Sequence, residues 1–228
     1  MKISQAIKIT GLALASMVVL TACASTDTVG KFAVKSFDEM TAELEIAPAY
    51  DEAKGAWALT TPTGERFLMT SDFAGQTDVT HELDLQTFVT AGLDVALLDQ
   101  ALYQVDETNG KLLVVGDLGS DSLGVESSKS MKDAVEGIVK NYRESIGYHS
   151  KLYHYGIAMG NGNMLEWASD MSKNDKDLVI VLNPEPLIAA GVDPTKLEGW
   201  AYAEVEMMDE NENPIFMFKF LKPFEIKN

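Results

Sequence analysis

The sequence predicts an α+β fold of two tandem repeats, each with a helix packed on a small antiparallel or mixed β-sheet. Two observations predict this fold. Residue patterns recur at a separation of 98 or 99 positions, and helical and strand patterns follow one another in the same order in both copies. The pattern leaves open whether the strands of the two copies form one sheet or two.

The repeat rests on turn and core positions that keep their order in both copies, with one inserted residue between them. The matched pairs are Gly64 and Gly162, Phe67 and Leu165, Ser71 and Ser169, Asp78 and Asp177, Gly92 and Gly191, Leu98 and Leu197, and Tyr103 and Tyr202. Because glycines, turn residues and core residues match together, we interpret the pattern as an internal duplication.

Each copy is predicted to begin with a helix. Ser36 and Glu39 have the spacing of a capping box, in which each side chain bonds the backbone at the start of a helix. Phe37 and Met40 then lie on one helical face. Ser130 opens a similar pattern in the second copy. We therefore expect the two helices to begin near Ser36 and Ser130.

The elements expected after each helix are a hairpin, a strand, a short helical turn that ends in Ala-Gly, and a final hairpin. In the first copy their key positions are 62–64, 79–85, 91–92 and 107–110. In the second copy they are 160–162, 178–182, 190–191 and 209–214. The glycine of each Ala-Gly pair suits a helix end that needs a positive φ.

The N-terminus carries the pattern of an export signal. Lys2 and Lys8 give it positive charge, and the run from Ile9 to Leu20 is largely apolar. Such a run is too short to span a bilayer comfortably and is typical of a signal peptide. The run ends in Leu20-Thr21-Ala22-Cys23, which resembles the lipobox of bacterial lipoproteins.

The resemblance implies that the leader is cut before Cys23 and that the Cys23 thiol receives a diacylglycerol. The mature chain would then be attached to a membrane through this lipid anchor. In this family a residue other than aspartate after the cysteine, here Ala24, goes with the outer membrane. The resemblance therefore implies a place in the cell envelope, at the outer membrane and facing the periplasm or the surface.

On this interpretation the chain has five segments. They are a signal peptide at 1–22, an acylated tether at 23–30, the first repeat at 31–115, a linker at 116–129 and the second repeat at 130–228. The linker is dense in Gly, Ser and Asp. Cys23 is the single cysteine, so an acylated chain has no thiol left for a disulfide and must be stabilised by burial.

Acidic residues dominate the composition. The chain has 35 Asp and Glu against 18 Lys and Arg, a formal net charge of −17. Loss of Lys2 and Lys8 with the signal peptide would make the mature chain more acidic still. Such a charge repels nucleic acid and anionic lipid, and it attracts cations and basic partners. We therefore expect no nucleic acid among the partners.

The segment from 148 to 155 is the candidate binding surface, because its aromatic-rich sequence has no counterpart in the first copy. The candidate binding residues are Tyr148, His149, Tyr153, His154 and Tyr155. The two histidines are five positions apart, a spacing that suits two metal ligands neither on a helix nor on a strand. The chain also lacks a G-x-S-x-G motif. The sequence therefore predicts no metal site, no cofactor and no identifiable catalytic residue.

These features predict a lipid-anchored envelope protein that binds another envelope protein or a small ligand and is not an enzyme. A stable anchor holds a protein close to its partner, which suits recruitment. Two alternatives remain open. One is an envelope hydrolase with a dispersed site, in which His149 or His154 acts with a neighbouring acid. The other is a lipoprotein that captures metal ions or polycations.

Overall fold

The computed structural model describes residues 26–73, 77–118, 127–149, 152–170, 176–208 and 214–225. The predicted signal peptide, Cys23, most of the predicted linker and the turn at 209–213 lie outside these residues. Within them the chain forms two six-stranded antiparallel sheets and four α-helices, which confirms a mixed α+β fold. None of the described helices is long and apolar enough to cross a membrane.

The two halves contain the same α-helices and strands in the same order, and each half adds one 3-10 helix at a different place, Val95–Leu97 in the first and Arg143–Ser145 in the second. The first half contains α1 (Thr26–Glu43), β1 (Ala49–Asp51), β2 (Ala56–Thr60), β3 (Arg66–Thr70), β4 (Val79–Asp84), α2 (Leu85–Thr90), β5 (Tyr103–Asp106) and β6 (Lys111–Gly116). The second half contains α3 (Met131–Asn141), β7 (Ile146–His149), β8 (His154–Gly160), β9 (Asn163–Ala168), β10 (Leu178–Leu182), α4 (Pro184–Ala189), β11 (Ala201–Met208) and β12 (Pro214–Phe224). The shared order is consistent with tandem repeats.

The two sheets also have the same strand order. The first sheet is ordered β1-β2-β3-β4-β6-β5, and the second is ordered β7-β8-β9-β10-β12-β11. The turns predicted at 62–64 and 160–162 connect β2 to β3 and β8 to β9. The strands predicted at 79–85 and 178–182 are β4 and β10. Each strand of the first half therefore has a counterpart in the second.

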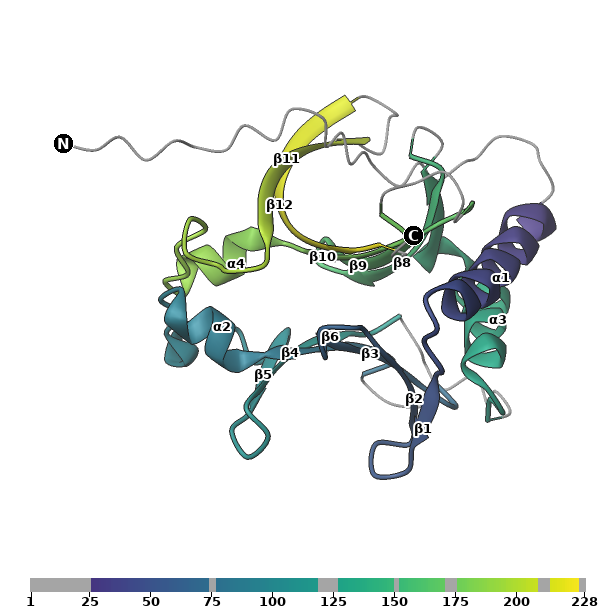
Figure 1. Ribbon diagram of the computed structural model, residues 1–228, viewed down its shortest axis with the longest axis horizontal. Helices are drawn as coiled ribbons and strands as arrows, with labels where there is room; N and C mark the ends of the chain where they lie inside the picture. The colour runs from purple at the N-terminus through teal and green to yellow at the C-terminus, as the bar shows by residue number, and fades with distance from the viewer. Residues whose placement is uncertain are drawn as a thin grey trace.

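The sheets lie face to face and share one apolar core (Figure 1). Phe67 and Leu83 from the first sheet belong to the same cluster of buried side chains as Leu165 and Leu182 from the second. Figure 1 shows α1 and α3 at one end of the two stacked sheets and α2 and α4 at the other. The copies therefore form two sheets whose inner faces share the largest apolar core, while each outer face carries only a small apolar cluster of its own.

The two halves meet symmetrically beside α2 and α4. The backbone N–H of Asp94 donates to the carbonyl of Ala190 at 2.7 Å, and the N–H of Asp193 donates to the carbonyl of Ala91 at 2.8 Å. Each bond is the counterpart of the other under exchange of the two halves. The predicted Ala-Gly helix ends therefore join the repeats to each other as well as ending the helices.

Glycine follows each of these alanines for two reasons. Gly92 and Gly191 have φ values of 109° and 99°, a region that side chains rarely adopt. A Cβ atom on either glycine would also lie 2.6 Å from the carbonyl oxygen of the other. The sequence predicted the positive φ, whereas the close approach of the two backbones is visible only in the fold.

The helix of each half packs on the sheet of the other half. α1 precedes the first sheet but packs on β7 and β9 of the second, and α3 precedes the second sheet but packs on β2 and β3 of the first. The two helices also pack against each other. This differs from the predicted arrangement, in which each helix covers its own sheet. The exchange binds the halves together, because each sheet needs the helix of the other repeat.

α1 begins at Thr26, ten residues before the predicted start, and so includes part of the predicted tether. Ser36 lies inside this helix and does not cap it. Its Oγ donates to the carbonyl of Ala33 at 3.1 Å and accepts the Nε1–H of Trp167 at 2.9 Å. In the second half Ser130 caps α3 as predicted, because its Oγ accepts a backbone N–H of the first turn at 3.1 Å.

One of the matched pairs is not structurally equivalent. Tyr103 lies opposite Val114 and is buried in the core, whereas Tyr202 lies opposite Phe220 and is 41% exposed. The sequence match between the two tyrosines therefore predicted a shared structural role that the fold does not have. The physical reason is strand register: the connection before β11 is two residues shorter than that before β5, so Trp200 and not Tyr202 matches Tyr103.

Candidate functional site

The aromatic-rich segment predicted as a binding surface forms the β7–β8 hairpin, which distributes its residues over three places. Tyr148 pairs with Tyr155, and His149 pairs with His154. The two tyrosine rings face the core with their centroids 4.7 Å apart, and the two histidines lie on the opposite, outer face of the sheet. Tyr153 lies in the turn and is 58% exposed. The five residues therefore do not form one surface.

Tyr153 has an unusual backbone conformation for an aromatic residue. Its φ is 58°, and Gly55 has a φ of 60° at the corresponding position of the first half. The correspondence is supported by hydrogen bonds, because Ser71 N–H donates to the Gly55 carbonyl and Ser169 N–H donates to the Tyr153 carbonyl. Such a conformation costs a residue with a side chain about 1–3 kcal/mol. An exposed tyrosine therefore occupies a position where glycine is the less strained choice.

The two histidines are buried on the outer face of the second sheet. His149 Nδ1 accepts the backbone N–H of Leu152 at 2.8 Å. His154 Nδ1 lies 3.5 Å from Glu166 Oε2, and both side chains are less than one-tenth exposed. This pair has the residue types of a base and its orienting acid. Both side chains are buried, so in this structure the pair is not open to a substrate from solvent.

Lys219 is a fourth buried ionisable group on this outer face, after His149, His154 and Glu166. Its Nζ donates to the carbonyl of Gly162 at 3.0 Å. Burial lowers the pKa of Lys219, and the negative charges of Glu185 and Glu166 act in the opposite direction. Among the described residues no group of three or more His, Cys, Asp or Glu side chains is arranged to hold a metal ion.

The outer faces of the two sheets differ in chemistry. On the first sheet Arg66 bonds both Asp51 and Glu82 at 2.7 Å, and Lys54 also pairs with Glu82. On the second sheet the corresponding face carries a buried apolar cluster beside the buried ionisable groups described above. Its buried cluster consists of Met164, Val179, Val181, Val205 and Leu221. The repeats therefore share a scaffold but present different surfaces.

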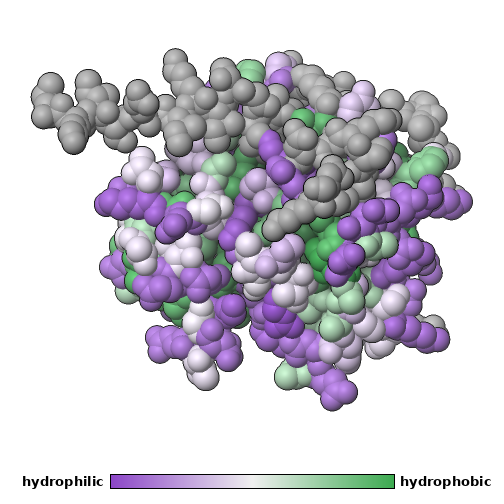
Figure 2. All heavy atoms as spheres, in the orientation of Figure 1, coloured by the Kyte–Doolittle hydropathy of each residue, from purple (hydrophilic) through white to green (hydrophobic). Residues whose placement is uncertain are grey.

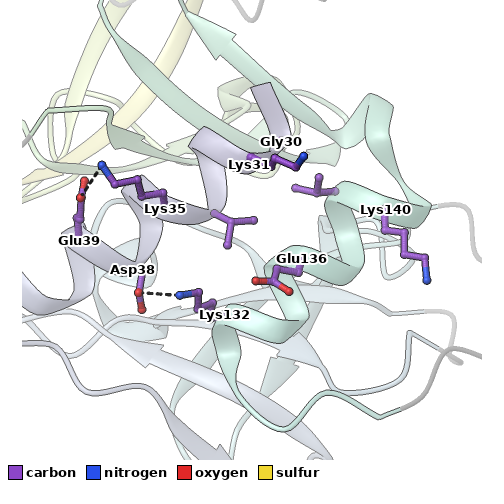
Figure 3. A pocket seen from close by; sticks show the side chains of 10 residues that line it. Gly30, Lys31, Lys35, Asp38, Glu39, Lys132, Glu136 and Lys140 are labelled. Atoms are coloured by element: carbon purple, nitrogen blue, oxygen red, sulfur yellow. Dashed lines mark hydrogen bonds and ion pairs between the residues drawn. The ribbon is translucent and has the colours of Figure 1, made fainter. Parts of the chain in front are cut away.

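A groove of about 690 Å³ runs along α1 and α3 (Figure 3). Its floor is apolar where the helices approach closely, since a Cβ on Gly30 would lie 2.2 Å from Val139 Cγ1. Lys132 of α3 pairs with Asp38 of α1 at 2.9 Å across the groove. The charged residues that line it are Lys31, Lys35, Lys132 and Lys140, with Asp38, Glu39 and Glu136. The groove is thus nearly neutral, in contrast to the acidic chain.

The β11–β12 hairpin is the largest departure from the symmetry of the two halves. Val79 of β4 pairs with Gly116 of β6, whereas Leu178 of β10 pairs with Phe224 of β12, so the second segment is nine residues longer. β11 and β12 have eight and eleven residues, against four and six in β5 and β6. Figure 1 shows the longer hairpin curving away from the two stacked sheets.

This hairpin exposes a row of aromatic side chains beside a row of acids. Phe216 and Phe218 are 63% and 47% exposed, and the ring of Tyr202 stacks on Phe218 with centroids 4.7 Å apart. Glu206 lies opposite Phe216 and Glu204 opposite Phe218, and directly paired residues share one face of a sheet. We call these five residues the aromatic–acidic face.

None of these five residues is among the candidate binding residues that the sequence predicted. The run from Ile215 to Leu221 is almost entirely apolar, and such a run is typical of a buried strand. The available signal was the greater length of this segment in the second copy. Figure 2 shows hydrophilic side chains over much of one side of the described surface, with smaller apolar patches between them.

His81 gives the fold a predictable response to pH. It is fully buried on β4, its Nε2–H donates to the carbonyl of Met164 at 3.2 Å, and burial lowers its pKa from 6.5 to about 4. The unfolded chain therefore binds a proton at a higher pH than the folded chain. The contribution of neutral His81 is complete above pH 6.5 and is lost as the pH falls toward 4, which amounts to about 3 kcal/mol.

Urea unfolding at pH 7.0 and pH 4.5 tests this expectation. The matched variant is His81→Ile, because Ile180 occupies the corresponding position of the second half. The variant should lose less stability between the two pH values than the wild type, whatever its absolute stability. Equal losses in both proteins would show that His81 titrates normally in the folded chain.

The chain matches no protein-family model, no curated protein and no solved structure. Its function is therefore argued from its own residues. Features that occur in both halves serve the fold that the two halves have in common. Features that occur in one half only are the better candidates for a specific function, and the aromatic–acidic face is one of these.

Proposed function

We propose that this chain is a membrane-anchored lipoprotein of the bacterial envelope that binds a partner and catalyses no reaction. Cleavage before Cys23 and acylation of its thiol would make this residue the lipid-modified N-terminus. Two or three acyl chains on one residue are enough for stable anchoring. Ala24 after the cysteine supports the outer membrane as the location. The two halves would derive from one α+β unit, with binding added to the second.

The start of α1 supports an anchor in this place. Thr26 lies three residues after Cys23, so the helix begins within about 10 Å of the acylated residue. The groove on α1 and α3 is nearly neutral, whereas the whole chain carries a net charge of −17. Anionic lipid headgroups are therefore repelled less by this end of the molecule than by an evenly acidic surface. The β11–β12 hairpin lies away from these helices (Figure 1).

The aromatic–acidic face is the observation that carries the binding proposal. Apolar side chains exposed together on a folded protein typically mark an interaction surface. Aromatic residues contribute most to such surfaces because they bury a large area at a small cost in side-chain entropy. The face occurs on an extension that the first half lacks, so packing of the scaffold does not require it.

The anchor is tested by replacing its cysteine. Cys23→Ser removes the thiol that would accept the diacylglycerol, so the precursor should stay uncut by the lipoprotein signal peptidase. Metabolic labelling with a palmitate analogue should mark the wild type and leave the variant unlabelled. Labelling of the variant at the wild-type level would refute the anchor.

The binding role is tested by native mass spectrometry of the acylated protein, gently extracted from its own membrane. A bound mass of defined stoichiometry is expected with the wild type. It should be lost from the double variant Phe216→Ser, Phe218→Ser and kept by Phe32→Ser, which changes a phenylalanine of α1 that is 54% exposed. A bare polypeptide in all three samples, or a mass that survives the double variant, would contradict binding by this face.

A further inference from the structure

We infer that the partner presents an extended basic segment that adds to the free edge of β11. This inference rests on the proposed binding role and names the chemistry of the partner. Three properties of the hairpin support it: a strand edge that no other described strand covers, an acidic row beside that edge, and an exposed aromatic row one strand further in. Each property selects a feature of the partner.

The edge of β11 selects an extended backbone. β11 is the last strand of the second sheet and, among the described residues, pairs with β12 alone. Its other edge therefore carries backbone N–H and C=O groups along eight residues. An extended segment that adds as a further strand satisfies these groups with main-chain hydrogen bonds. A helix cannot do so, because its backbone groups are already paired within the helix.

The acidic row selects positive charge on that segment. Glu204 and Glu206 are alternate residues of β11, so their side chains share one face. A strand added to β11 places every second side chain on the same face, directly beside these glutamates. Lysine or arginine at alternate positions would pair with them. The charged ends would lie at the glutamates while the aliphatic stems cover Tyr202 and Phe218, which adds apolar and cation–π contact.

A second copy of this chain fits the edge less well. Two β11 strands paired about a twofold axis perpendicular to the sheet would place the glutamates of both copies on one face. Like charges brought together across strands are destabilising. The net charge of −17 on each chain adds to this repulsion. The same charge opposes contact with an anionic lipid surface. The edge is thus protected against self-association and complementary to a basic strand.

The probe for this inference is a fluorescein-labelled eight-residue peptide in which lysine alternates with threonine or valine. Its control has the same composition with the lysines in one block, so that both peptides carry the same charge. Fluorescence anisotropy is measured with the mature, acylated protein in detergent micelles. The alternating peptide should bind more tightly than the block peptide, because only the first can place all its lysines on one face.

Charge reversal locates the site. The double variant Glu204→Lys, Glu206→Lys should bind the alternating peptide about tenfold more weakly than the wild type. Glu107→Lys, Glu198→Lys changes two exposed glutamates outside the hairpin by the same total charge and should bind within about twofold of the wild type. Hydrogen exchange followed by mass spectrometry should show that the peptide slows exchange of β11 amides.

Equal binding of the two peptides, equal effects of the two double variants, or unchanged exchange in β11 would each overturn the inference. The outcome is separable from that of the proposed function. A bound mass that depends on Phe216 and Phe218, found together with no preference for the alternating peptide, would keep the binding role and reject the basic strand. Loss of both results would reject the binding role as well.

Discussion

Residues 126–228 expressed without the first half are expected to lose cooperative unfolding. The second sheet shares its apolar core with the first, so separation would expose the inner faces of β8, β9 and β10. The fragment would also lack α1, which packs on β7 and β9 in the intact chain. Without the shared core the fragment keeps only the small apolar cluster on its outer face, which is little burial to offset its loss of conformational entropy.

Buried polar contacts between the sheets add to this expectation. Lys222 of the second sheet pairs with Glu65 of the first, and both side chains are largely buried. Burial would raise the pKa of Glu65, but hydrogen bonds from Lys222 and two threonines outweigh it, and the pKa lies below its usual value. In the isolated fragment Lys222 loses this partner. The Met164 carbonyl likewise loses the Nε2–H of His81.

Circular dichroism in the near ultraviolet and thermal unfolding measure the effect. The fragment should lack a sharp transition and bind a hydrophobic dye, whereas residues 23–125 and 126–228 produced together should regain one sharp transition. That control places the chain break in the linker while keeping both sheets. A sharp transition of the isolated fragment would show that the shared core is not required for folding.

Local sequence signals predicted the parts of the fold that depend on short-range chemistry. Gly64 and Gly162 lie in the turns of the β2–β3 and β8–β9 hairpins, because tight turns of this kind need a positive φ. Ser130 caps a helix because a side-chain oxygen can replace the missing backbone partner. The order of elements and the internal repeat followed from such signals together with the period of the apolar residues.

Features that depend on long-range packing were predicted poorly. Gly30 weakens the helical signal of its segment, yet the close contact with Val139 requires it, so the start of α1 was placed too late. Ser36 has the spacing of a cap, but its hydroxyl bonds Trp167, which is distant in sequence. The sequence does not show which sheet a helix packs on. Each helix would bury the same apolar face whether it packed on the sheet of its own half or on that of the other half.

For the candidate site too, the sequence predicted local features and missed those that depend on long-range packing. The segment from 148 to 155 was selected for its aromatic content and its lack of a counterpart in the first copy. Alternation along β7 and β8 sends its tyrosines inward and its histidines outward, so shared sequence position did not produce a shared surface. The exposure of Phe216 and Phe218 was not predicted. These residues are exposed because they lie in the part of β12 that extends beyond β10, and the strand register that sets this extension cannot be read from the sequence.

Trp167→Ala is expected to lower the free energy of unfolding by about 3–5 kcal/mol, because it removes the largest fully buried side chain and leaves a cavity. The ring of Trp167 packs edge-on against Phe37 of α1 with centroids 5.2 Å apart, and its Nε1–H donates to Ser36 Oγ at 2.9 Å. The loss therefore falls on the contact between α1 and the second sheet. Urea unfolding of the wild type and the variant measures it.

Two further variants separate packing from the hydrogen bond. Ser36→Ala leaves the ring in place but removes the acceptor of its N–H, which should cost about 1 kcal/mol. Trp57→Ala changes a tryptophan that is only partly buried and should cost less than Trp167→Ala. If Trp167→Ala cost no more than Trp57→Ala, α1 would not be held by this contact. Because α1 is the element that follows the proposed lipid anchor, a firm contact here lets the anchor position the whole two-sheet body and the hairpin that it carries.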